Sequence, residues 1–357
     1  LYYDSSNFNN LMQVNIFANA KLKLKPSTSS SGNGDYQLAQ DAILELSEGY
    51  PLNCQEGTEI TGLGELRLST GGDLNTLGTT MGLQIAETIA INQYGGHLGG
   101  NGKIFYNGTH NWTEGDIFVG NYYLGADGIL NLTGSGTKRM GNGTFHNNGT
   151  VNMMSGMGGG NLNFNINDGA SLNIGDNLSV WHTGGGSNTP ILNNYGLVHK
   201  TGSGYSNFDV CALNNYGTFW LETGSIRFYA GSSTHYNDAG SGAEYHLAGK
   251  LILRYGSFST NNVDVTLDGA LGEIRDEDDV DLLAACMGTS ASGSFTLQNG
   301  ANLVTNGNFT NNGTLDLGTG YLGGAGNFTA AGNSSLIIGS VDGISLSESS
   351  GNIQKTG

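Results

Sequence analysis

The sequence predicts a right-handed parallel β-solenoid, an all-β fold in which short strands stack turn upon turn. Three observations predict it. The composition disfavours long helices, an Asn-containing motif recurs at nearly constant spacing, and apolar residues alternate with a period of two between Gly-containing corners.

The composition favours strands and corners over helices. The 357 residues include 61 Gly and 3 Pro. Gly costs a helix about 1 kcal/mol relative to Ala, and Asn, Ser and Thr compete for backbone hydrogen bonds. Hydrophobic residues make up 37% of the chain and aromatic residues 9%, which is more than a disordered chain carries. We therefore expect a folded chain with a long, thin core.

The repeated motif sets the length of a turn. The first Asn of each Asn-containing unit falls at Asn147, Asn193, Asn214 and Asn311, so the gaps are 46, 21 and 97 residues. These gaps are close to multiples of roughly 21 to 24 residues, which predicts roughly 15 turns. Asn side chains at one position in successive turns are expected to form amide ladders. The motif occurs at residues 145–151 (FHNNGTV), 192–198 (LNNYGLV), 213–219 (LNNYGTF) and 309–315 (FTNNGTL).

Short alternating segments supply the strands. An apolar residue at every second position is typical of a strand that is buried on one face. The Gly and Asn residues between these segments provide the positive φ angles that tight corners need. An array of immunoglobulin-like sandwiches is the second interpretation, but no Trp and Cys pairing recurs at its spacing. Clear examples of the segments are residues 42–46 (AILEL), 64–68 (GELRL), 128–132 (GILNL), 170–174 (ASLNI) and 335–338 (SLII).

The two ends of the chain differ in character. Residues 1–26 are interpreted as an N-terminal arm and edge strand, and residues 27–357 as one continuous solenoid. Outward lysines followed by Pro protect an edge strand, whereas the C-terminal stretch has no such protection. The unprotected C-terminal end of one copy could pair with the N-terminal arm of the next copy. This contrast between the ends predicts head-to-tail assembly into a homopolymer. The residues assigned to this contact are Lys21, Lys23, Lys25, Ile338 and Ile353.

The charge balance restricts the partners. With 13 basic and 30 acidic residues, the formal charge of −17 disfavours nucleic acid and anionic lipid. The sequence has no run of about 18 apolar residues, so it predicts no membrane span. The chain begins at Leu1 without a leader, so we interpret it as a mature, secreted chain or as an ordered portion of a longer one. Cys54, Cys211 and Cys286 are far apart and odd in number, and whether any of them forms a disulfide is left open.

Catalytic signatures are missing from the sequence. It has no H-E-x-x-H, C-x-x-C, G-x-S-x-G or complete phosphate-binding loop, so we expect no enzyme. A groove lined by aromatic side chains would instead indicate a carbohydrate-binding or polysaccharide-cleaving β-helix. The aromatic residues considered for it are Trp112, Trp181, Trp220 and Tyr229.

One dense acidic cluster occurs at residues 276–281 (DEDDVD). Its first interpretation is a solvated surface loop. Its second is a Ca²⁺ site, because hard cations take carboxylate oxygens, and its third is the acid and base pair of a polysaccharide-cleaving enzyme. The possible calcium ligands are Asp276, Asp278, Asp279 and Asp281, and no other cofactor is expected.

Ten N-x-S/T sequons are present. They are interpreted as corner chemistry, in which a Thr hydroxyl closes a turn, and as possible glycosylation sites on a secreted chain. Their Asn residues are Asn107, Asn111, Asn131, Asn142, Asn148, Asn177, Asn308, Asn312, Asn327 and Asn333.

Three features together resemble the repeat pattern of a known class of proteins. They are residues 111–117 (NWTEGDI), the Gly-rich residues 125–136 and the Asn-Asn-Gly-Thr units. The chain is similar, from about residue 64 to 357, to secreted bacterial adhesin-like β-solenoid repeat proteins. Filamentous haemagglutinins and autotransporter passenger domains are built in this style. The resemblance implies an extracellular, cell-surface protein with a structural or adhesive role, and surface glycans as partners.

Overall fold

Parallel strands stack into a β-solenoid of about 13 turns in the computed structural model of the chain. This confirms the predicted parallel β-helix. Among the described residues there is no α-helix, and η1 (Leu282–Ala285) is a short 3₁₀ helix. The described residues are 2–3, 8–28, 30–141, 143–182, 190–209, 211–229, 243–254, 261–339, 344–346 and 353–355.

The turns number fewer than the roughly 15 expected from the motif spacing, because several turns are longer than that spacing. Leu44 pairs with Leu66, a separation that agrees with the motif. Thr218 pairs with Glu244, and Val265 with Phe295, across longer stretches of chain. In the turn from Val265 to Phe295, the extra residues lie between the strands Glu273–Arg275 and Gly288–Thr289, and the strand pairing stays in register.

The chain divides into two compact units. The N-terminal unit comprises Leu1–Asn173 and Leu178–Leu192, and the C-terminal unit comprises Ile174–Asn177 and Asn193–Gly357. This division differs from the predicted boundary after residue 26. Residues 13–24 already form two strands of a solenoid turn and belong to the N-terminal unit.

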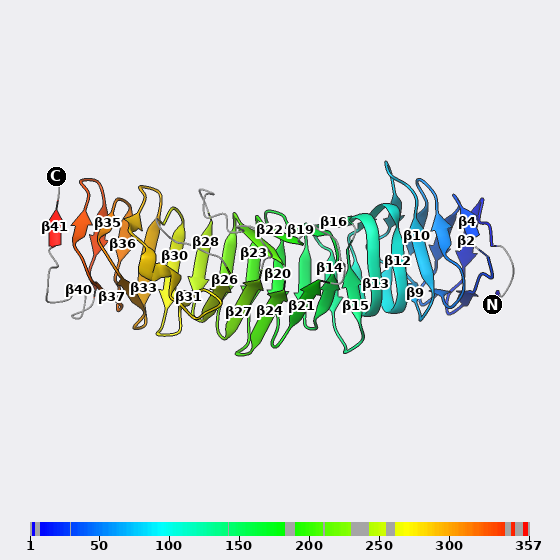
Figure 1. Ribbon diagram of the computed structural model, residues 1–357. Helices are drawn as coiled ribbons and strands as arrows, with labels where there is room; N and C mark the ends of the chain where they lie inside the picture. The colour runs from blue at the N-terminus through cyan, green and yellow to red at the C-terminus, as the bar shows by residue number, and fades with distance from the viewer. Residues whose placement is uncertain are drawn as a thin grey trace. The chain divides into compact units, whose positions relative to one another are not determined.

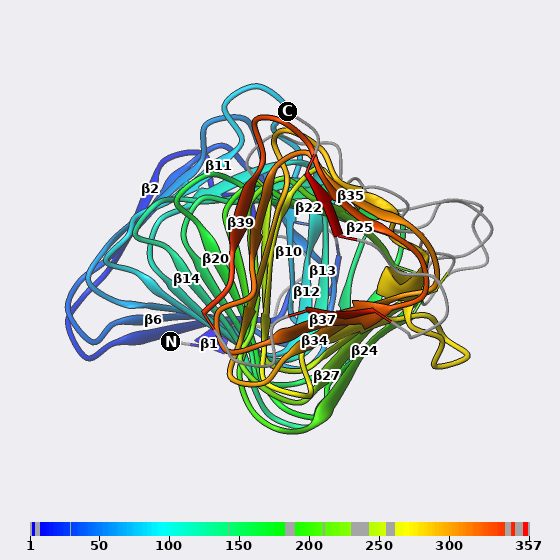
Figure 2. The same ribbon diagram turned by 90° about the vertical axis from the view of Figure 1, so that its left-hand side faces the viewer.

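The N-terminal unit has three stacks of parallel strands, and each turn contributes one strand to each stack (Figure 1). In Figure 2, β2 and β11 lie on one side of this unit and β6 and β14 on another. The first stack contains β2 (Gln13–Ile16), β5 (Asp35–Leu38), β8 (Glu59–Gly62), β11 (Leu83–Ile85), the ends of β12 (Ala90–Tyr106) and β13 (Thr109–Leu124), β16 (Gly143–Asn147) and β19 (Leu162–Ile166). The second contains β1 (Tyr2–Tyr3), β3 (Lys21–Leu24), β6 (Ile43–Leu46), β9 (Glu65–Leu68), the starts of β12 and β13, β14 (Ile129–Leu132), β17 (Thr150–Met153) and β20 (Ser171–Ile174). The third contains β4 (Ser30–Gly32), β7 (Leu52–Cys54), β10 (Asp73–Thr76), the middles of β12 and β13, β15 (Lys138–Met140), β18 (Met157–Gly159) and β21 (Ser179–His182).

The C-terminal unit is likewise built from parallel stacks. Its second stack is continuous and contains β23 (Leu197–Lys200), β26 (Thr218–Leu221), β28 (Glu244–Leu247), β30 (Asp264–Asp268), β33 (Ser294–Gln298), β36 (Thr314–Asp316) and β39 (Ser335–Ile337). Its first stack contains β22 (Ile191–Asn194), β25 (Ala212–Asn215), β32 (Gly288–Thr289), β35 (Phe309–Asn311), β38 (Phe328–Ala330) and β41 (Ile353–Lys355). Its third contains β24 (Tyr205–Asp209), β27 (Ser225–Tyr229), β29 (Lys250–Leu253), β31 (Glu273–Arg275), β34 (Asn302–Thr305), β37 (Tyr321–Gly324) and β40 (Ile344–Leu346).

In-register pairing builds the core from columns of apolar side chains. In the second stack of the N-terminal unit, Leu22, Leu44, Leu66 and Ile91 are consecutive partners, and all four are buried. Burial of each such side chain stabilises the fold by about 2 kcal/mol. The side chains between them point outward, which is the period of two seen in the sequence.

Buried Asn residues close the corner between the first and second stacks. The Asn147 amide donates to the Ser171 carbonyl at 2.8 Å, and its oxygen accepts from the Gly149 N–H at 3.0 Å. Asn311 donates in the same way to the Ser335 carbonyl at 2.7 Å. These bonds satisfy backbone groups of two successive turns, so the corner Asn is structural.

The predicted Asn alignment was wrong at two of its four positions. Asn193 and Asn214 are half-buried outward residues, and the Asn214 amide donates to the Asn193 oxygen at 2.8 Å. Their neighbours Asn194 and Asn215 take the buried corner position, with the Asn194 amide 2.7 Å from the Asn215 oxygen. A shift of one residue along a strand moves a side chain to the opposite face.

The N-terminal lysines are paired with the next turn. Lys21 and Lys23 both contact Glu45, the latter at 3.3 Å, and Lys25 lies 2.8 Å from Glu48. These contacts tie the first turn to the second, and they lower the pKa of both carboxyl groups. At the other end, Ile338 is exposed. Ile353 lies in β41, where the structure describes the strand but not the side chain.

One polar network is enclosed in the core of the N-terminal unit. The His110 ring lies 3.2 Å from the Gln93 oxygen through Nε2 and 3.2 Å from the Tyr122 hydroxyl through Nδ1. Gln93 in turn donates to the carbonyls of Gly96 and Asp116. Burial lowers the pKa of His110 to about 3, so the ring stays neutral in the folded chain.

The first prediction concerns the pH dependence of stability. Unfolded His110 gains a proton below about pH 6.5, whereas the folded residue does so only near pH 3. The contribution of neutral His110 to the free energy of unfolding is therefore complete above pH 6.5. It is lost as the pH falls below that value, by up to about 1.4 kcal/mol per pH unit. The His110→Gln variant should be less stable than the parent chain at pH 7, and the difference should narrow by on the order of 1 kcal/mol at pH 5. Urea unfolding of both chains at pH 7 and pH 5 measures this difference in stability. The same difference at both pH values would contradict a buried, neutral His110.

The second prediction compares two glycines. Gly62 has φ +113°, and a Cβ there would lie 1.8 Å from the Leu38 carbonyl oxygen, whereas a Cβ at Gly307 meets nothing within 4 Å. Gly62→Ala is expected to cost about 3 kcal/mol or more because it combines strain with a backbone clash. Gly307→Ala should stay within about 0.5 kcal/mol of the parent. Equal unfolding midpoints in urea for the two variants would refute the close approach at Gly62.

Candidate functional site

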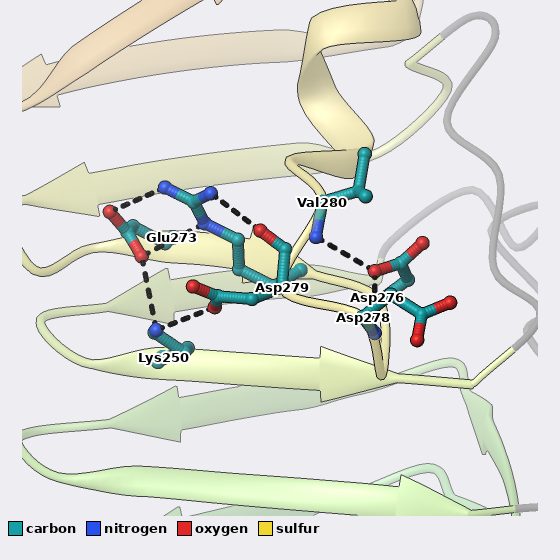
Figure 3. A network of polar contacts seen from close by, with 7 residues as sticks. Lys250, Glu273, Asp276, Asp278, Asp279 and Val280 are labelled. Carbon is teal, nitrogen blue, oxygen red and sulfur yellow. Dashed lines mark hydrogen bonds and ion pairs between the residues drawn. The ribbon is translucent and has the colours of Figure 1, made fainter.

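The acidic loop follows β31 and leads into η1 in the C-terminal unit (Figure 3). Two of its carboxylates organise the backbone. Asp276 accepts from the N–H groups of Asp278 and Val280 at 2.9 and 2.8 Å. Asp281 accepts from the Leu283 N–H at 2.9 Å and caps η1. The loop is therefore shaped by its own side chains, as Asx turns commonly are.

Basic side chains from neighbouring strands balance the remaining charge. Lys250 lies 2.8 Å from Asp279 and 3.8 Å from Glu273. Arg275 forms a two-point contact with Glu273 at 3.1 and 3.0 Å and donates to the Asp279 carbonyl (Figure 3). The Lys250 ammonium lowers the pKa of Asp279. Solvent screens such exposed pairs, so they contribute little to stability.

Three of the four possible calcium ligands are occupied by different partners. Asp276 and Asp281 bind backbone N–H groups, Asp279 pairs with Lys250, and Asp278 is exposed. Within the part of the chain that the structure describes, no group of three or more His, Cys, Asp or Glu is placed to hold a metal ion. Calcium binding at this loop stays a prediction.

A small cleft adjoins the loop in the same unit. Its volume is about 200 Å³. An isolated backbone bridge joins Arg275 to Asp281 and brings the end of the loop back against β31. Burial raises the pKa of Asp281, whose carboxyl group is partly enclosed. The lining residues are Leu267, Ala270, Gly272, Glu273, Arg275, Asp281, Leu283, Asn302 and Val304.

A column of charged side chains on the N-terminal unit was not found from the sequence. Asp73, His97, Asp116 and Arg139 are consecutive partners in the third stack. Asp116 is only 2% exposed; its carboxylate contacts Arg139 through two hydrogen bonds and lies 3.1 Å from His97 Nδ1. Each of these residues lies one turn further along the chain than the one before. Their spacing of about one turn is the feature of the sequence that could have related them.

Two lysine side chains are fully buried and fill protruding corners. Lys138 donates to the carbonyls of Gly134 and Gly136 at 3.1 and 3.0 Å, and burial lowers its pKa. Lys200 donates to the carbonyls of Thr201 and Gly202 at 2.7 and 2.9 Å and lies 3.3 Å from Asp176. In both corners an ammonium group satisfies carbonyl oxygens that would otherwise face inward without a partner.

The four aromatic residues considered for a sugar groove lie in different environments. Trp112 is completely buried in the core, whereas Trp181 and Trp220 are exposed. Trp220 stacks on His199 with ring centroids 4.6 Å apart. Tyr229 lies between Arg227 and Arg254, at 4.9 and 3.6 Å from its ring centroid. The contacts on the outer rings hold neighbouring turns together.

The sequons divide into two groups. Asn111 and Asn131 belong to an outward amide ladder, and the amides of Asn107 and Asn148 also hold hydrogen bonds to neighbouring turns. A glycan on these four would replace the hydrogen bonds, so they are poor acceptors in the folded chain. Asn142 lies outside the described residues. The exposed sequon residues are Asn177, Asn308, Asn312, Asn327 and Asn333. Of these, Asn312 donates its amide to the Thr289 carbonyl of the preceding turn at 2.9 Å, so it is a poor acceptor as well.

The three cysteines are free and buried. Burial raises the pKa of Cys54 to about 12 and raises that of Cys286 as well. A buried thiol with a raised pKa is unreactive, because the thiolate is the reactive form. The cysteines therefore pack as small apolar residues.

No family model, no curated protein and no solved structure matches the chain. Within the described residues, no helix is long and apolar enough to cross a membrane.

The third prediction tests the charged column with a matched pair of variants. Asp116 is nearly inaccessible between Arg139 and His97, whereas Asp209 is 37% exposed where it pairs with Arg227. Asp116→Asn should cost about 2 kcal/mol because it removes the charge of a nearly inaccessible carboxylate that accepts two hydrogen bonds from Arg139. Asp209→Asn should cost less than about 1 kcal/mol. Equal losses in urea unfolding at pH 7 would show that the burial of Asp116 carries no extra stability.

Proposed function

We propose that the chain is an extracellular structural or adhesive element that presents its outer surfaces to cell-surface glycans and performs no catalysis. The observation that carries this proposal is an outward amide ladder on the second stack of the N-terminal unit. Each Asn in it donates to the oxygen of the one before, at 2.8 to 2.9 Å. Its members are Asn92, Asn111, Asn131, Asn152 and Asn173.

The ladder supports a structural role because it joins successive turns independently of the backbone. Its members recur every strand, about 4.8 Å apart, so the outer face repeats one chemistry at short, regular intervals. Extended repeat surfaces bind partners through many equivalent contacts, and the gain from multivalency exceeds that of any single contact. An adhesive element needs both properties.

The sequence adds support for the location. The repeat resembles that of secreted adhesin-like solenoids, and an acidic chain stays soluble and disfavours nonspecific binding to anionic surfaces. The exposed sequons other than that of Asn312 would accept glycans on a secretory route without disturbing the core. These features favour the cell surface over the cell interior.

Self-association belongs to the same proposal. Strand β2 pairs with β5, and Leu11, Met12 and Phe17 are exposed beside β2. An available strand edge flanked by apolar side chains accepts a strand from a second copy. Repetition of this contact would give a fibre, because a heterologous contact does not close on itself.

A second candidate is a carbohydrate-binding or polysaccharide-cleaving protein. The cleft beside the acidic loop favours it, because Glu273 and Asp281 line one concave site together with Arg275. Glycoside hydrolysis uses two carboxyl groups of this kind. Binding needs fewer conditions than cleavage, since it requires no fixed carboxylate separation.

The fourth prediction separates these functions. The purified chain should be retained on surfaces coated with polysaccharide and should form filaments visible by electron microscopy, while releasing no reducing sugar ends. Heat-unfolded chain is the control for retention. Release of reducing ends that disappears in Glu273→Gln would show an enzyme instead. Absence of both retention and filaments would refute the structural and adhesive proposal.

A further inference from the structure

The cleft of the C-terminal unit combines the chemistry that a sugar ring requires. Glu273, Asp281 and Asn302 place carboxylate and amide oxygens along it, and Arg275 supplies a guanidinium. Arg275 uses three N–H groups on Glu273 and the Asp279 carbonyl, which leaves two of its five donors. Sugar hydroxyls both donate and accept, so they match a wall that carries both kinds of group.

The rest of the lining is apolar. Among these lining residues Val304 is 43% exposed, whereas Leu267 and Leu283 are buried behind the surface. The C–H face of a sugar ring packs on such surfaces, whereas a small polar ion gains nothing from them. A ligand that fits this cleft is therefore polar around its edge and apolar on one face.

Size and charge narrow the ligand further. A volume of about 200 Å³ is smaller than the roughly 300 to 1,000 Å³ of sites for drug-sized ligands, so one ring fits rather than a chain. Among the lining residues, Glu273 and Asp281 are acidic and Arg275 is basic, which leaves a formal charge of −1. Like charges disfavour an anionic ligand.

We propose that this cleft is a binding site for a single sugar ring without negative charge, such as the end of a surface glycan. Glu273, Asp281 and Asn302 bind its hydroxyls, Arg275 orients Glu273 and donates to the ring, and Val304 packs against its C–H face. The site deepens the proposed adhesive function by naming its ligand, and it rests on that function for its biological role. Binding of single sugars in solution does not depend on adhesion.

The decisive experiment uses the full chain and five monosaccharides at pH 7. Saturation-transfer NMR and calorimetric titration measure binding of glucose, galactose, mannose, glucosamine and glucuronate. At least one of the first four should bind with a dissociation constant on the order of 1 mM, as expected for a ligand of this size. Glucuronate should bind at least about tenfold more weakly than that sugar because of the charge of the lining.

Two variants locate the binding. Val304→Tyr should fill the cleft and abolish the signal, and Asn302→Ala should weaken binding about fivefold by removing one hydrogen-bonding group. Ile337→Tyr and Asn163→Ala are the matched controls, because both residues are exposed strand residues outside the cleft. Both controls should bind like the parent chain. Circular dichroism checks the folding of every variant, and Asn302→Ala carries the test where Val304→Tyr fails to fold.

Three results would overturn the inference. These are no transfer from any of the first four sugars, equal binding of glucuronate, and unchanged binding in folded Val304→Tyr and Asn302→Ala. If both folded variants bind sugars like the parent chain but the chain is retained on glycan surfaces, the adhesive function is supported without this site. Sugar binding that Val304→Tyr abolishes, in a chain that polysaccharide surfaces do not retain, supports the site and refutes the adhesive function.

Discussion

Parallel pairing of each turn with the next, residue by residue, is the constraint on which the rest of the structure depends. Strands about 4.8 Å apart in fixed register place equivalent side chains directly above one another. A residue is therefore surrounded by its counterparts in neighbouring turns. Leu22, Leu44 and Leu66 form a continuous core column for this reason. The same register sets the outward Asn ladder.

Columns also determine where polar groups are tolerated inside. His110 continues the column of Ile91 and Leu130, and it is accommodated because Gln93 and Tyr122 hydrogen-bond both ring nitrogens. The corner Asn residues and the two buried lysines follow the same rule, since each satisfies carbonyls that the sharp bends leave free. Buried polar side chains in this fold thus serve the backbone of the corners.

The concave site arises where this regularity is interrupted. The turn that leads from Val265 to its partner Phe295 is longer than the motif spacing, and its extra length forms the acidic loop and η1. The inserted residues return to β31 through the bridge between Arg275 and Asp281, and the cleft lies beside that bridge. Flat outer faces suit repeated, weak contacts, whereas a lengthened corner creates an enclosed site. An adhesive solenoid with a lectin-like site would combine the two.

The sequence by itself determined the strand period, the Gly and Asn corners, the length of the shorter turns and hence the parallel β-helix. It also placed Asn147 and Asn311 at corners correctly, because their local motif fixes the bend. Only the tertiary structure decided that Asn193 and Asn214 point outward, that Lys21 pairs with Glu45, and that Arg275 and Asp281 share a cleft. The first two depend on which residue of the next turn lies opposite, and the third depends on how the acidic loop folds back onto β31. Because the corners differ in length from one turn to the next, that register is hidden from any reading of one strand at a time.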